Sequence, residues 1–511
     1  MAITHQPLTP PRPLVLVVGD IDGDELGVAE KAFARRGYRL QSTDKGDLFN
    51  LAGSVDSVVL LPTLGRRGEQ AATLEQYGSA LLDADCRIYV RDTELSGAEV
   101  LLNALSEAKL PVGYASGAFK SLDNEPYSPR VEVCVHSTSW EELSQLVAKY
   151  PGGPRPSYDL EIVGSALSSS AELLVRRAFH DCSRVELEQM SEGMSGVSAY
   201  RAYASVRDAN LGPSPYPFFI KIGPRGKIVS EVQNYRGNAL AYIPFHLGPR
   251  LIEQRCGLGA QLGLLVCDLV SDCLCLKDCA KFVGVPAIAS LFNRTLKAWH
   301  ETSKVSNGSL AAFLAPRLDK RPTIPEARYA IAHELGARHD FDALRRLFAL
   351  RDRPENVRVG AIHGDLHATN VMVRGIDAVL IDFESQLNDQ PLLIDPASLE
   401  AGLLVDGFCN DDRTAADILD SLRPLYTGDL LDWRASPHAA TQSAWFYDCV
   451  RQIRLHAKHL ECAPDQYATA LTCALLSKAA NADEKLAQDA RRHQMRAVGY
   501  VFAEQILSPT A

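Results

Sequence analysis

The first third of the chain alternates short apolar runs with amphipathic stretches. Leu14–Val18 and Val58–Leu61 are apolar at every position, as strands buried on both faces of a parallel sheet are. Four further strand candidates are Tyr38–Ser42, Arg87–Val90, Val112–Ala115 and Val131–Val135. Because helical stretches lie between the strand candidates, the pattern predicts a doubly wound α/β domain over residues 14–149.

A Pro- and Gly-rich segment, YPGGPRP at residues 150–156, separates this domain from a region with a different pattern. Four strand candidates follow it, and a helix candidate at Val229–Ala241 precedes the last of them. The strand candidates are Val185–Met190, Ala199–Val206, Pro217–Ile222 and Leu262–Val270. The pattern therefore predicts a β-rich domain over residues 157–270.

From about Ala280 onward, the apolar positions recur at helical spacing. Ile288, Leu291 and Trp299 follow this period, and Ala444–Leu460 is a long amphipathic stretch. Residues 271–511 are therefore predicted to form a largely helical domain. At the other end of the chain, the Pro-rich residues 1–13 are predicted to be a disordered lead-in.

Composition narrows the class of protein. The apolar fraction of 46% and the charged fraction of 23% are typical of a soluble globular protein. The net charge is −10 and there is no dense Lys/Arg run, so we expect no nucleic-acid partner. No segment approaches the roughly 18 uninterrupted apolar residues of a membrane helix, and the N-terminus lacks a signal-peptide pattern. We therefore expect a cytoplasmic protein that does not bind a membrane.

The candidate chemistry is concentrated in Ile362–Glu384, IHGDLHATNVMVRGIDAVLIDFE. Asp365 follows a His-Gly pair, Asn370 lies five residues beyond it, and Asp382 ends the apolar run Ala378–Ile381. Phosphoryl transfer needs a carboxylate that orients a hydroxyl nucleophile, and oxygen ligands for the Mg²⁺ that neutralises a nucleoside triphosphate. The segment therefore indicates a phosphotransferase that uses Mg²⁺ and ATP or GTP.

This segment, in a helical domain that follows a β-rich domain, resembles the aminoglycoside phosphotransferase and choline kinase-like family, a small-molecule branch of the protein-kinase fold. The resemblance implies an α+β bilobal protein-kinase-like fold, with a small β-rich lobe and a large helical lobe. It also implies that Asp365 is the catalytic carboxylate, that Asn370 and Asp382 bind the metal, and that His363 supports the catalytic loop.

The same resemblance assigns residues for nucleotide binding in the β-rich lobe. Lys221, near the end of a strand candidate, matches the family's lysine that contacts the nucleotide phosphates. Glu231, on the following helix candidate, matches the glutamate that holds this lysine. An edge-strand Lys and a solvated Glu are the alternative interpretation of the same two residues.

The turn SEGMSGVS at Ser191–Ser198 contains fewer glycines than the GxGxxG loop of protein kinases. In the resemblance, Ser195, Gly196 and Ser198 cover the phosphates through backbone amides and hydroxyl groups. An ordinary hairpin turn fits these residues nearly as well. The position of the turn, two strands before Lys221, favours the phosphate-binding interpretation.

The motifs do not determine the acceptor substrate. Aminoglycosides and amino alcohols are cationic, and acidic residues of the helical domain are available to bind them, although exposed acids are an equally simple explanation. These acids are Asp406, Asp411, Asp412 and Asp417. A sugar, a nucleoside or a protein side chain is also an open alternative. Asp395, thirteen residues beyond Asp382, resembles the family's later aspartate and is predicted to stabilise the helical lobe rather than to react.

The N-terminal domain has four acidic residues, Asp20, Asp22, Asp24 and Glu25, directly after its first strand candidate. Receiver domains of the flavodoxin-like class bind Mg²⁺ at this edge of the sheet, but their phosphoacceptor Asp is replaced here by Pro-Thr after the third strand candidate. The acids also suit the N-terminus of the next helix. We therefore predict a flavodoxin-like, degenerate receiver-like or Rossmann-like domain that mediates regulation or assembly, through a protein partner or self-association.

Together, these features predict a Mg²⁺-dependent phosphotransferase that moves the γ-phosphoryl group of ATP or GTP to a hydroxyl of a small molecule or a protein. The alternative from another class is a non-catalytic nucleotide-binding scaffold with the same fold, acting in a bacterial signalling system.

Overall fold

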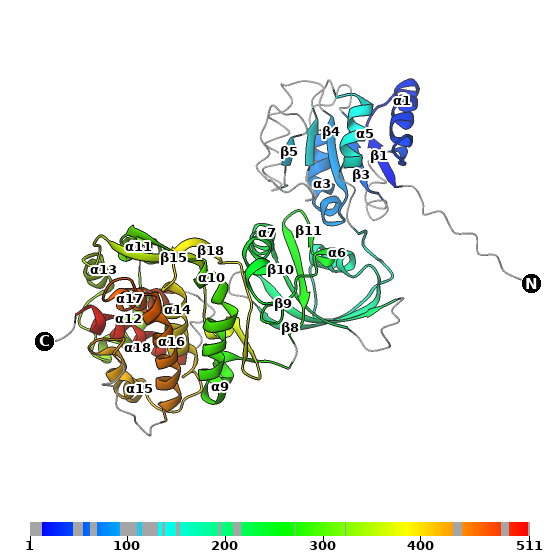
Figure 1. Ribbon diagram of the computed structural model, residues 1–511. Coiled ribbons are helices and arrows are strands. Elements are labelled where there is room, and N and C mark those ends of the chain that lie inside the picture. Colours follow the sequence, from blue (N-terminus) through cyan, green and yellow to red (C-terminus); the bar gives the residue numbers. More distant parts are fainter. Residues whose placement is uncertain are drawn as a thin grey trace, which may run out of the picture. The chain divides into compact units, whose positions relative to one another are not determined.

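The structure is a computed structural model that divides into two compact units, one formed by Met1–Val229 and Leu251–Leu269 and the other by Ser230–Arg250 and Val270–Ala511 (Figure 1). The described residues are 13–43, 55–61, 69–91, 110, 112–114, 131–134, 138–149, 154–192, 196–207, 216–270, 272–321, 323–432, 442–481 and 490–508. The predicted lead-in, residues 1–13, lies almost entirely outside them.

The first unit begins with a six-stranded sheet in the order β2-β1-β3-β4-β6-β5, and all neighbouring strands are parallel. Its strands are β1 (Leu14–Val18), β2 (Arg39–Thr43), β3 (Ser57–Leu60), β4 (Arg87–Arg91), β5 (Val112–Tyr114) and β6 (Val131–Cys134). These six strands overlap the six that the sequence predicts. The order β2-β1-β3-β4 is that of flavodoxin-like sheets, but β6 follows β4, and the receiver-like assignment stays a prediction.

Helices cover both faces of this parallel sheet. Because successive strand side chains point to opposite faces, Leu14, Leu16 and Val18 join one apolar cluster while Val15 and Val17 join another. The first cluster contains residues of α3 (Glu69–Asp83), and the second contains residues of α1 (Gly23–Ala34) and α5 (Trp140–Lys149). Burial on both faces explains why β1, and β3 after Ser57, are continuous apolar runs.

The second sheet of the first unit has the order β11-β12-β10-β9-β8-β7, and its neighbours are antiparallel except for the parallel pair β7–β8. The strands are β7 (Glu161–Gly164), β8 (Cys182–Glu192), β9 (Ser198–Val206), β10 (Tyr216–Pro224), β11 (Gly257–Leu258) and β12 (Leu262–Asp268). One face of the sheet shares an apolar cluster with α6 (Ser169–Ala178). The sequence predicts parts of β8, β9, β10 and β12 but not β7 or α6.

A buried arginine joins the two sheets of the first unit. Arg177 of α6 donates from Nη1 to the carbonyl oxygens of Asp83 (3.0 Å) and Leu258 (2.9 Å), and its Nη2 lies 3.1 Å from Oδ1 of Asp85. The Asp83 carboxylate in turn accepts a hydrogen bond from the backbone N–H of Ala260 (2.9 Å). Buried charges are stable only when they are paired and hydrogen-bonded, so this set fixes the α3–β4 turn against the β11–β12 turn.

The second unit is mostly helical and also contains two small antiparallel sheets, β13-β16-β17 and β14-β15-β18 (Figure 1). Their strands are β13 (Leu274–Cys275), β14 (Lys304–Gly308), β15 (Glu355–Ile362), β16 (Val371–Arg374), β17 (Asp377–Leu380) and β18 (Leu387–Pro391). The α-helices are α9 (Leu276–Ser290), α10 (Lys297–Glu301), α11 (Leu310–Asp319), α12 (Glu326–Glu334), α13 (Phe341–Ala349), α14 (Ile394–Asp406), α15 (Ala415–Leu422), α16 (Ala444–Leu460), α17 (Gln466–Ala480) and α18 (Ala490–Leu507).

Several short helical segments complete the architecture. The helix α7 (Arg225–Asn234) begins in the first unit, ends in the second, and continues as a π-helical turn, Tyr235–Ala239, and then as α8 (Leu240–Tyr242). Short 3₁₀ or π-helical turns are Glu253–Arg255, Leu291–Thr295, Ala368–Asn370 and Arg423–Tyr426. Among the described segments, none of the helices combines the length and the apolar character that crossing a membrane requires.

The interior of the helical unit contains a buried ion pair. Arg454 of α16 donates from Nε and Nη2 to the Glu400 carboxylate of α14, at 3.0 and 2.7 Å, and both side chains are almost fully buried. The Tyr467 hydroxyl of α17 donates to the same carboxylate (2.7 Å). Since every partner is hydrogen-bonded, the network fixes three helices relative to one another. The helix α14 also carries Asp395, which is important for the site described below.

Two histidine rings lie half-buried between helices of this unit. The His456 ring of α16 stacks on Phe292, with ring centroids 4.3 Å apart, and lies 4.8 Å from the His300 ring. Within the described part of the chain, Nε2 of His456 and Nδ1 of His300 are buried without a hydrogen-bond partner. Burial lowers the pKa of His300 to about 4 and that of His456 to about 3, so both imidazoles are neutral at physiological pH.

The protein is therefore expected to lose stability in mild acid. In the unfolded chain a histidine binds a proton near its ordinary pKa, whereas in the folded protein these two bind it only at lower pH. The unfolding free energy that they contribute is therefore fully present above the unfolded pKa and decreases as the pH falls below it. Between about pH 7.5 and about pH 5, each is expected to cost roughly 2 kcal/mol of unfolding free energy. Denaturant unfolding of His456→Phe, which preserves the stack, should show a weaker acid dependence. His459→Gln on the same helix is the control, and an equal change in both variants would contradict the prediction.

Candidate active site

The loop after β15 is held by the carboxylate of Asp395, at the first turn of α14. Asp395 accepts hydrogen bonds from the backbone N–H groups of His363 (2.7 Å) and Gly364 (3.0 Å). The carboxylate is 1% exposed, and desolvation raises its pKa although the neighbouring His363 and the two N–H groups oppose the shift. Asp395 therefore has the structural position in the helical unit that the sequence predicts, and it acts directly on the residues that precede Asp365.

The conformation of the loop requires glycine at position 364. Gly364 has a φ of +81°, and a Cβ atom there would lie 2.2 Å from the carbonyl oxygen of Ser385. The Gly364 carbonyl accepts a hydrogen bond from Nη1 of Arg317, in the last turn of α11 (3.1 Å). His363 is fully buried, and its Nε2–H donates to the Ile381 carbonyl (2.9 Å). The loop is thus fixed on three sides, and the His363 side chain provides one of these contacts.

Asp365 emerges from this loop with its carboxylate accessible. Its side chain is 56% exposed, and Oδ2 lies 3.5 Å from Nε2 of His367, whose Nδ1 contacts the Thr369 hydroxyl. Desolvation raises the pKa of Asp365, but the hydrogen bond and charge of His367, together with the charges of Lys478 and His363, outweigh it and hold the pKa below its ordinary value. The group is therefore a carboxylate at neutral pH, able to accept a hydrogen bond from a hydroxyl.

Asn370 and Asp382 are brought to the same loop by backbone pairing. The Asn370 side chain donates from Nδ2 to the Asp365 carbonyl (3.0 Å), and the Asn370 carbonyl accepts from the N–H of Ile381 (3.0 Å). Asp382 follows at once, with a φ of +69°, a left-handed conformation that Asp tolerates better than most residues. The Asn370 bond uses the amide nitrogen and leaves the amide oxygen as a ligand, so Asn370 and Asp382 fit a Mg²⁺ site of oxygen atoms.

Lys221 and the Gly-containing turn lie at neighbouring strands of the first unit. Lys221 pairs with Ala199 across the β9–β10 ladder, one position from the start of β9 at Ser198. Phe218, Ile220 and Ile222 enter the apolar cluster with α6, so alternation directs Lys221 to the opposite face, where it is nevertheless only 8% exposed. A buried lysine is unusual unless it is paired, which argues against the alternative of a solvated edge residue.

The remaining nucleotide-binding predictions are distributed around these strands. Gly196 has a φ of +76°, and Val197 packs closely on Gly223, since a Cβ on this glycine would lie 2.6 Å from Val197 Cγ2. Ser195 lies outside the described residues. Glu231 is buried in α7 at 6% exposure, which excludes the alternative of a solvated glutamate.

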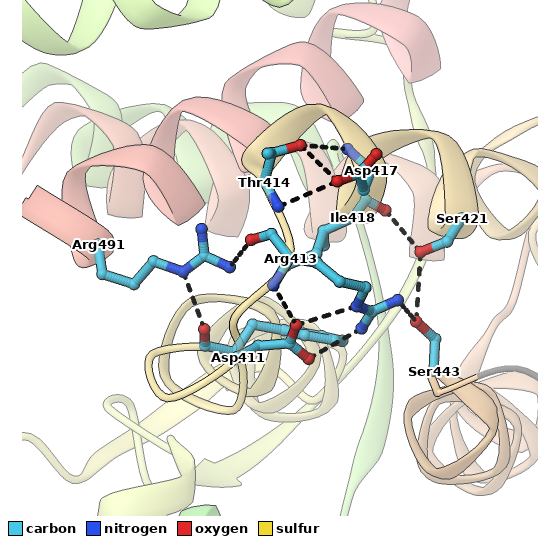
Figure 2. A network of polar contacts seen from close by, with 9 residues as sticks. Asp411, Arg413, Thr414, Asp417, Ile418, Ser421, Ser443 and Arg491 are labelled. Carbon is cyan, nitrogen blue, oxygen red and sulfur yellow. Dashed lines mark hydrogen bonds and ion pairs between the residues drawn. The ribbon is translucent and has the colours of Figure 1, made fainter.

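Three of the four acids that were candidates for a cationic acceptor have structural partners instead, and Figure 2 shows two of them, Asp411 and Asp417. Asp411 forms a two-pronged ion pair with Arg413, and Asp417 caps α15 through reciprocal hydrogen bonds with Thr414. These hydrogen bonds lower the pKa of both carboxyls. Asp406 lies 3.5 Å from Nε of Arg492, and Asp412 is solvent-exposed. Asp411 and Asp417 therefore stabilise the α14–α15 connection.

The acids of the N-terminal domain also have local roles. Asp22 caps α1 by accepting a hydrogen bond from the N–H of Glu25 (2.7 Å), as the helix-capping alternative predicts. The Glu25 carboxylate accepts from Arg91 (2.8 Å) and from the indole N–H of Trp140 (3.0 Å). The Pro-Thr pair after β3 lies outside the described residues. Among the described residues, no cluster of three His, Cys, Asp or Glu side chains is arranged to hold a metal.

Sequence reasoning missed three residues near Asp365. His367 lies inside the motif itself, so its place two residues after Asp365 was a signal that could have identified it. Arg317 and Lys478 come from α11 and α17, far away along the chain, and no local pattern identifies them. Only the packing of those helices brings their charges to the loop.

Comparison with known proteins gives weak but consistent similarities. The family model described as "Ternary complex associated domain 9" matches residues 326–480, which include all of Ile362–Glu384. No curated protein matches the sequence.

Solved structures similar to this chain are phosphotransferases. A thermostable mutant of aminoglycoside phosphotransferase APH(4)-Ia, in ternary complex with AMP-PNP and hygromycin B, is 14% identical, with 66% of this chain and 99% of that chain covered and a TM-score of 0.38. Glucosamine kinase in complex with glucosamine, ADP and inorganic phosphate is 12% identical, with coverage of 65% and 83% and a TM-score of 0.35. APH(3'')-Id from Streptomyces rimosus is 15% identical, with coverage of 57% and 99% and a TM-score of 0.30. Similarity at these values does not establish a shared activity.

Replacing Asp395 with Asn should loosen the catalytic loop. The substitution keeps the size of the side chain but replaces one acceptor oxygen with an amide N–H₂ donor. One of the two backbone N–H groups that Asp395 now accepts from would then lose its acceptor. We expect a loss of about 1–3 kcal/mol in unfolding free energy, measured by denaturant unfolding. Asp406→Asn, at the other end of the same helix and partly exposed, is the matched control. Equal stability of the two variants would show that Asp395 does not hold the loop.

Proposed function

We propose that this chain is a Mg²⁺-dependent phosphotransferase with a protein-kinase-like fold, which transfers the γ-phosphoryl group of ATP or GTP to a hydroxyl of a small molecule. The observation that carries the proposal is the convergence of Asp365, Asn370 and Asp382 on one loop, through the Asn370–Asp365 and Ile381–Asn370 hydrogen bonds. A carboxylate next to two oxygen ligands is the set that phosphoryl transfer requires.

In this proposal, each residue of the helical unit has a distinct task. Asp365 accepts a hydrogen bond from the acceptor hydroxyl, orients it towards the phosphorus, and takes its proton late in the reaction. Its lowered pKa suits this role, because it keeps the group ionised and makes it a positioning carboxylate rather than a strong base. Asn370 and Asp382 hold Mg²⁺, which supplies charge neutralisation for the phosphate oxygens when it is bound. His363 and Asp395 keep the loop in its conformation.

The assignments in the first unit complete the proposal. We assign Lys221 to the nucleotide phosphates, with Glu231 as its partner, and the turn containing Ser195, Gly196 and Ser198 to the cover over the phosphates. The support is the burial of Lys221 on the face of β10 opposite the apolar core, together with the start of β9 at Ser198 beside it. We propose that the α/β domain regulates the phosphotransferase or mediates its assembly with a partner. The support is the contact of Arg177 with both the α/β domain and the β11–β12 turn of the β-rich sheet.

The competing function is a non-catalytic nucleotide-binding scaffold. The description of the matching family refers to a ternary complex, which is the reason to consider it. Against it, a scaffold does not require an accessible carboxylate with a lowered pKa beside two potential metal ligands.

Calorimetric binding of a non-hydrolysable ATP analogue, with and without Mg²⁺, tests the metal site. Asp382→Asn should keep the fold, because Asn also tolerates the left-handed conformation, but should weaken Mg²⁺-dependent binding by roughly tenfold or more through loss of the charge. The matched control is Asp389→Asn, since Asp389 is a second left-handed aspartate (φ +54°) on the surface. If the folded wild type binds neither the ATP nor a GTP analogue, the phosphotransferase proposal is wrong.

The catalytic role of Asp365 is tested separately from nucleotide binding. Asp365→Asn removes the charge of an exposed side chain, so the fold and the affinity for Mg²⁺–ATP should change little. Transfer of phosphate to an acceptor should fall by roughly 100-fold or more, because the hydroxyl is no longer oriented and deprotonated. ADP release and the mass of the phosphorylated product are the measurements. Wild-type turnover by this variant would remove Asp365 from the proposed role, and unchanged nucleotide binding without turnover in the wild type would favour the scaffold.

A further inference from the structure

The helix α7 reaches the segment that follows the proposed metal ligand Asp382. The last residue of this helix is Asn234, whose Nδ2 donates to the backbone carbonyl oxygens of Phe383 (2.9 Å) and Glu384 (3.1 Å). All of these residues belong to the helical unit. Asn234 and Phe383 are 149 residues apart in the sequence, so only the tertiary structure makes this contact. One side chain thus binds the carbonyl groups of the two residues directly after Asp382.

This contact uses the donor chemistry of an asparagine amide. A side-chain N–H₂ group has two hydrogens, so it can donate to two carbonyl oxygens at once. Both partners of Asn234 are acceptors, so the side-chain nitrogen, and not the oxygen, faces them. The Phe383 carbonyl also accepts from the backbone N–H of Gln386 (3.2 Å), which closes a turn over these four residues. Asn234 therefore holds the start of the turn that follows Asp382.

The backbone of Asp382 is fixed on its preceding side as well. The Ile381 N–H donates to the Asn370 carbonyl (3.0 Å), and the Ile381 carbonyl accepts from Nε2 of His363 (2.9 Å). Asp382 itself has a φ of +69°, a conformation that costs free energy for residues other than glycine and persists where the surroundings impose it. Contacts on both sides of Asp382 supply this constraint, and Asn234 supplies it on the following side. 

A second asparagine, four residues further along the helix, reaches a later part of the same turn. The Nδ2 of Asn238 donates to Oε1 of Gln386 (2.6 Å), and the buried Gln386 side chain donates in turn to the Leu387 carbonyl (3.2 Å). Asn238 lies in the π-helical turn Tyr235–Ala239, a rare conformation that is often found at functional sites. Asn238 therefore contacts a side chain beyond the metal ligand, whereas Asn234 contacts the backbone next to it.

The position of Asn234 also relates the metal ligand to the proposed phosphate-binding residues. Glu231 precedes Asn234 by three residues, so the two side chains lie on the same face of α7. In the proposed function, Glu231 holds the lysine that binds the nucleotide phosphates, and Asp382 binds the metal that neutralises them. Asn234 thus joins the helix with one of these tasks to the segment with the other.

We propose that Asn234 is a positioning residue for the metal site, which holds the backbone of Asp382 in the conformation that binds Mg²⁺ and links it to the helix of Glu231. Asn234 acts through the two carbonyl groups and not through contact with the metal or the nucleotide. Its loss should therefore weaken nucleotide binding when Mg²⁺ is present and leave Mg²⁺-free binding nearly unchanged. This inference rests on the phosphotransferase function proposed above and adds a residue to its site.

The first test measures hydrogen exchange in the ligand-free, full-length protein. Asn234→Leu keeps the approximate size of the side chain and adds no charge, but removes both hydrogen bonds. Amide exchange across Ile381–Glu384 should become roughly tenfold faster or more. Asn238→Leu is the matched control, because it removes one hydrogen bond from the same helix to a side chain, and it should leave these amides unchanged. Unchanged exchange in Asn234→Leu, or an equal increase in both variants, would overturn the inference.

The second test measures the Mg²⁺ dependence of nucleotide binding. A non-hydrolysable ATP analogue is titrated calorimetrically into each protein with and without Mg²⁺. Asn234→Leu should lower the affinity roughly tenfold with Mg²⁺ and change it little without, whereas Asn238→Leu should preserve both affinities. Thermal unfolding verifies that each variant is folded, which we expect because the Tyr235 and Phe383 rings remain in contact (6.0 Å). If the ratio of the two affinities in Asn234→Leu equals that of the wild type, the inference is wrong.

Failure of this inference can be distinguished from failure of the proposed function. Binding of the analogue by the wild type tests the proposed function, whereas the difference in Mg²⁺ dependence between the wild type and Asn234→Leu tests the inference. A folded wild type that binds neither an ATP nor a GTP analogue overturns both. A wild type that binds the analogue, together with an Asn234→Leu variant of the same Mg²⁺ dependence, overturns only the role of Asn234.

Discussion

The candidate active site depends on one buried carboxylate. Asp395 accepts hydrogen bonds from the N–H groups of His363 and Gly364, and so it fixes the backbone from which Asp365 projects. A buried carboxylate is costly unless its hydrogen-bonding capacity is used, so the loop and the helix N-terminus stabilise each other. The helix α14 that carries Asp395 is in turn held by the Glu400–Arg454 pair and by Tyr467. The buried polar contacts of the helical unit thus fix α14, and through Asp395 they fix the loop that carries the accessible Asp365 carboxylate.

The site illustrates how one residue type serves different purposes in different environments. Asp395 is buried and structural, Asp365 is accessible and ionised, and Asp382 adopts a left-handed backbone conformation that few residues tolerate. Asp411 and Asp417 are close in sequence to these groups but stabilise a turn and a helix start. Counting acidic residues therefore says little about substrate charge, because the partners of each carboxylate determine whether it can receive a ligand.

The N-terminal α/β domain is connected to the β-rich sheet by a buried arginine and by Ala260, which joins the apolar cluster of the α/β domain. Arg177 reaches Asp83 and Asp85 on one side and the Leu258 carbonyl on the other. Within the same unit, Arg225 at the start of α7 donates to the Gly259 carbonyl of the β11–β12 turn. The β11–β12 turn therefore contacts both the α/β domain, through Asp83, and the start of α7, through Arg225.

The sequence by itself determined the features that depend on local periodicity and on spacing within a single segment. Continuous apolar runs identified β1 and most of β3, since strands buried on both faces are largely apolar. The motif at Ile362–Glu384 identified the residues that the loop brings together. It missed α6 and the short strands β7 and β11, and it could not assign partners to the acids after α14. Tertiary structure alone decided that the Arg317 guanidinium reaches the Gly364 carbonyl, because the position of α11 results from its packing against α17 and not from any local pattern. Contacts between segments far apart in the chain leave no periodic pattern in a single sequence.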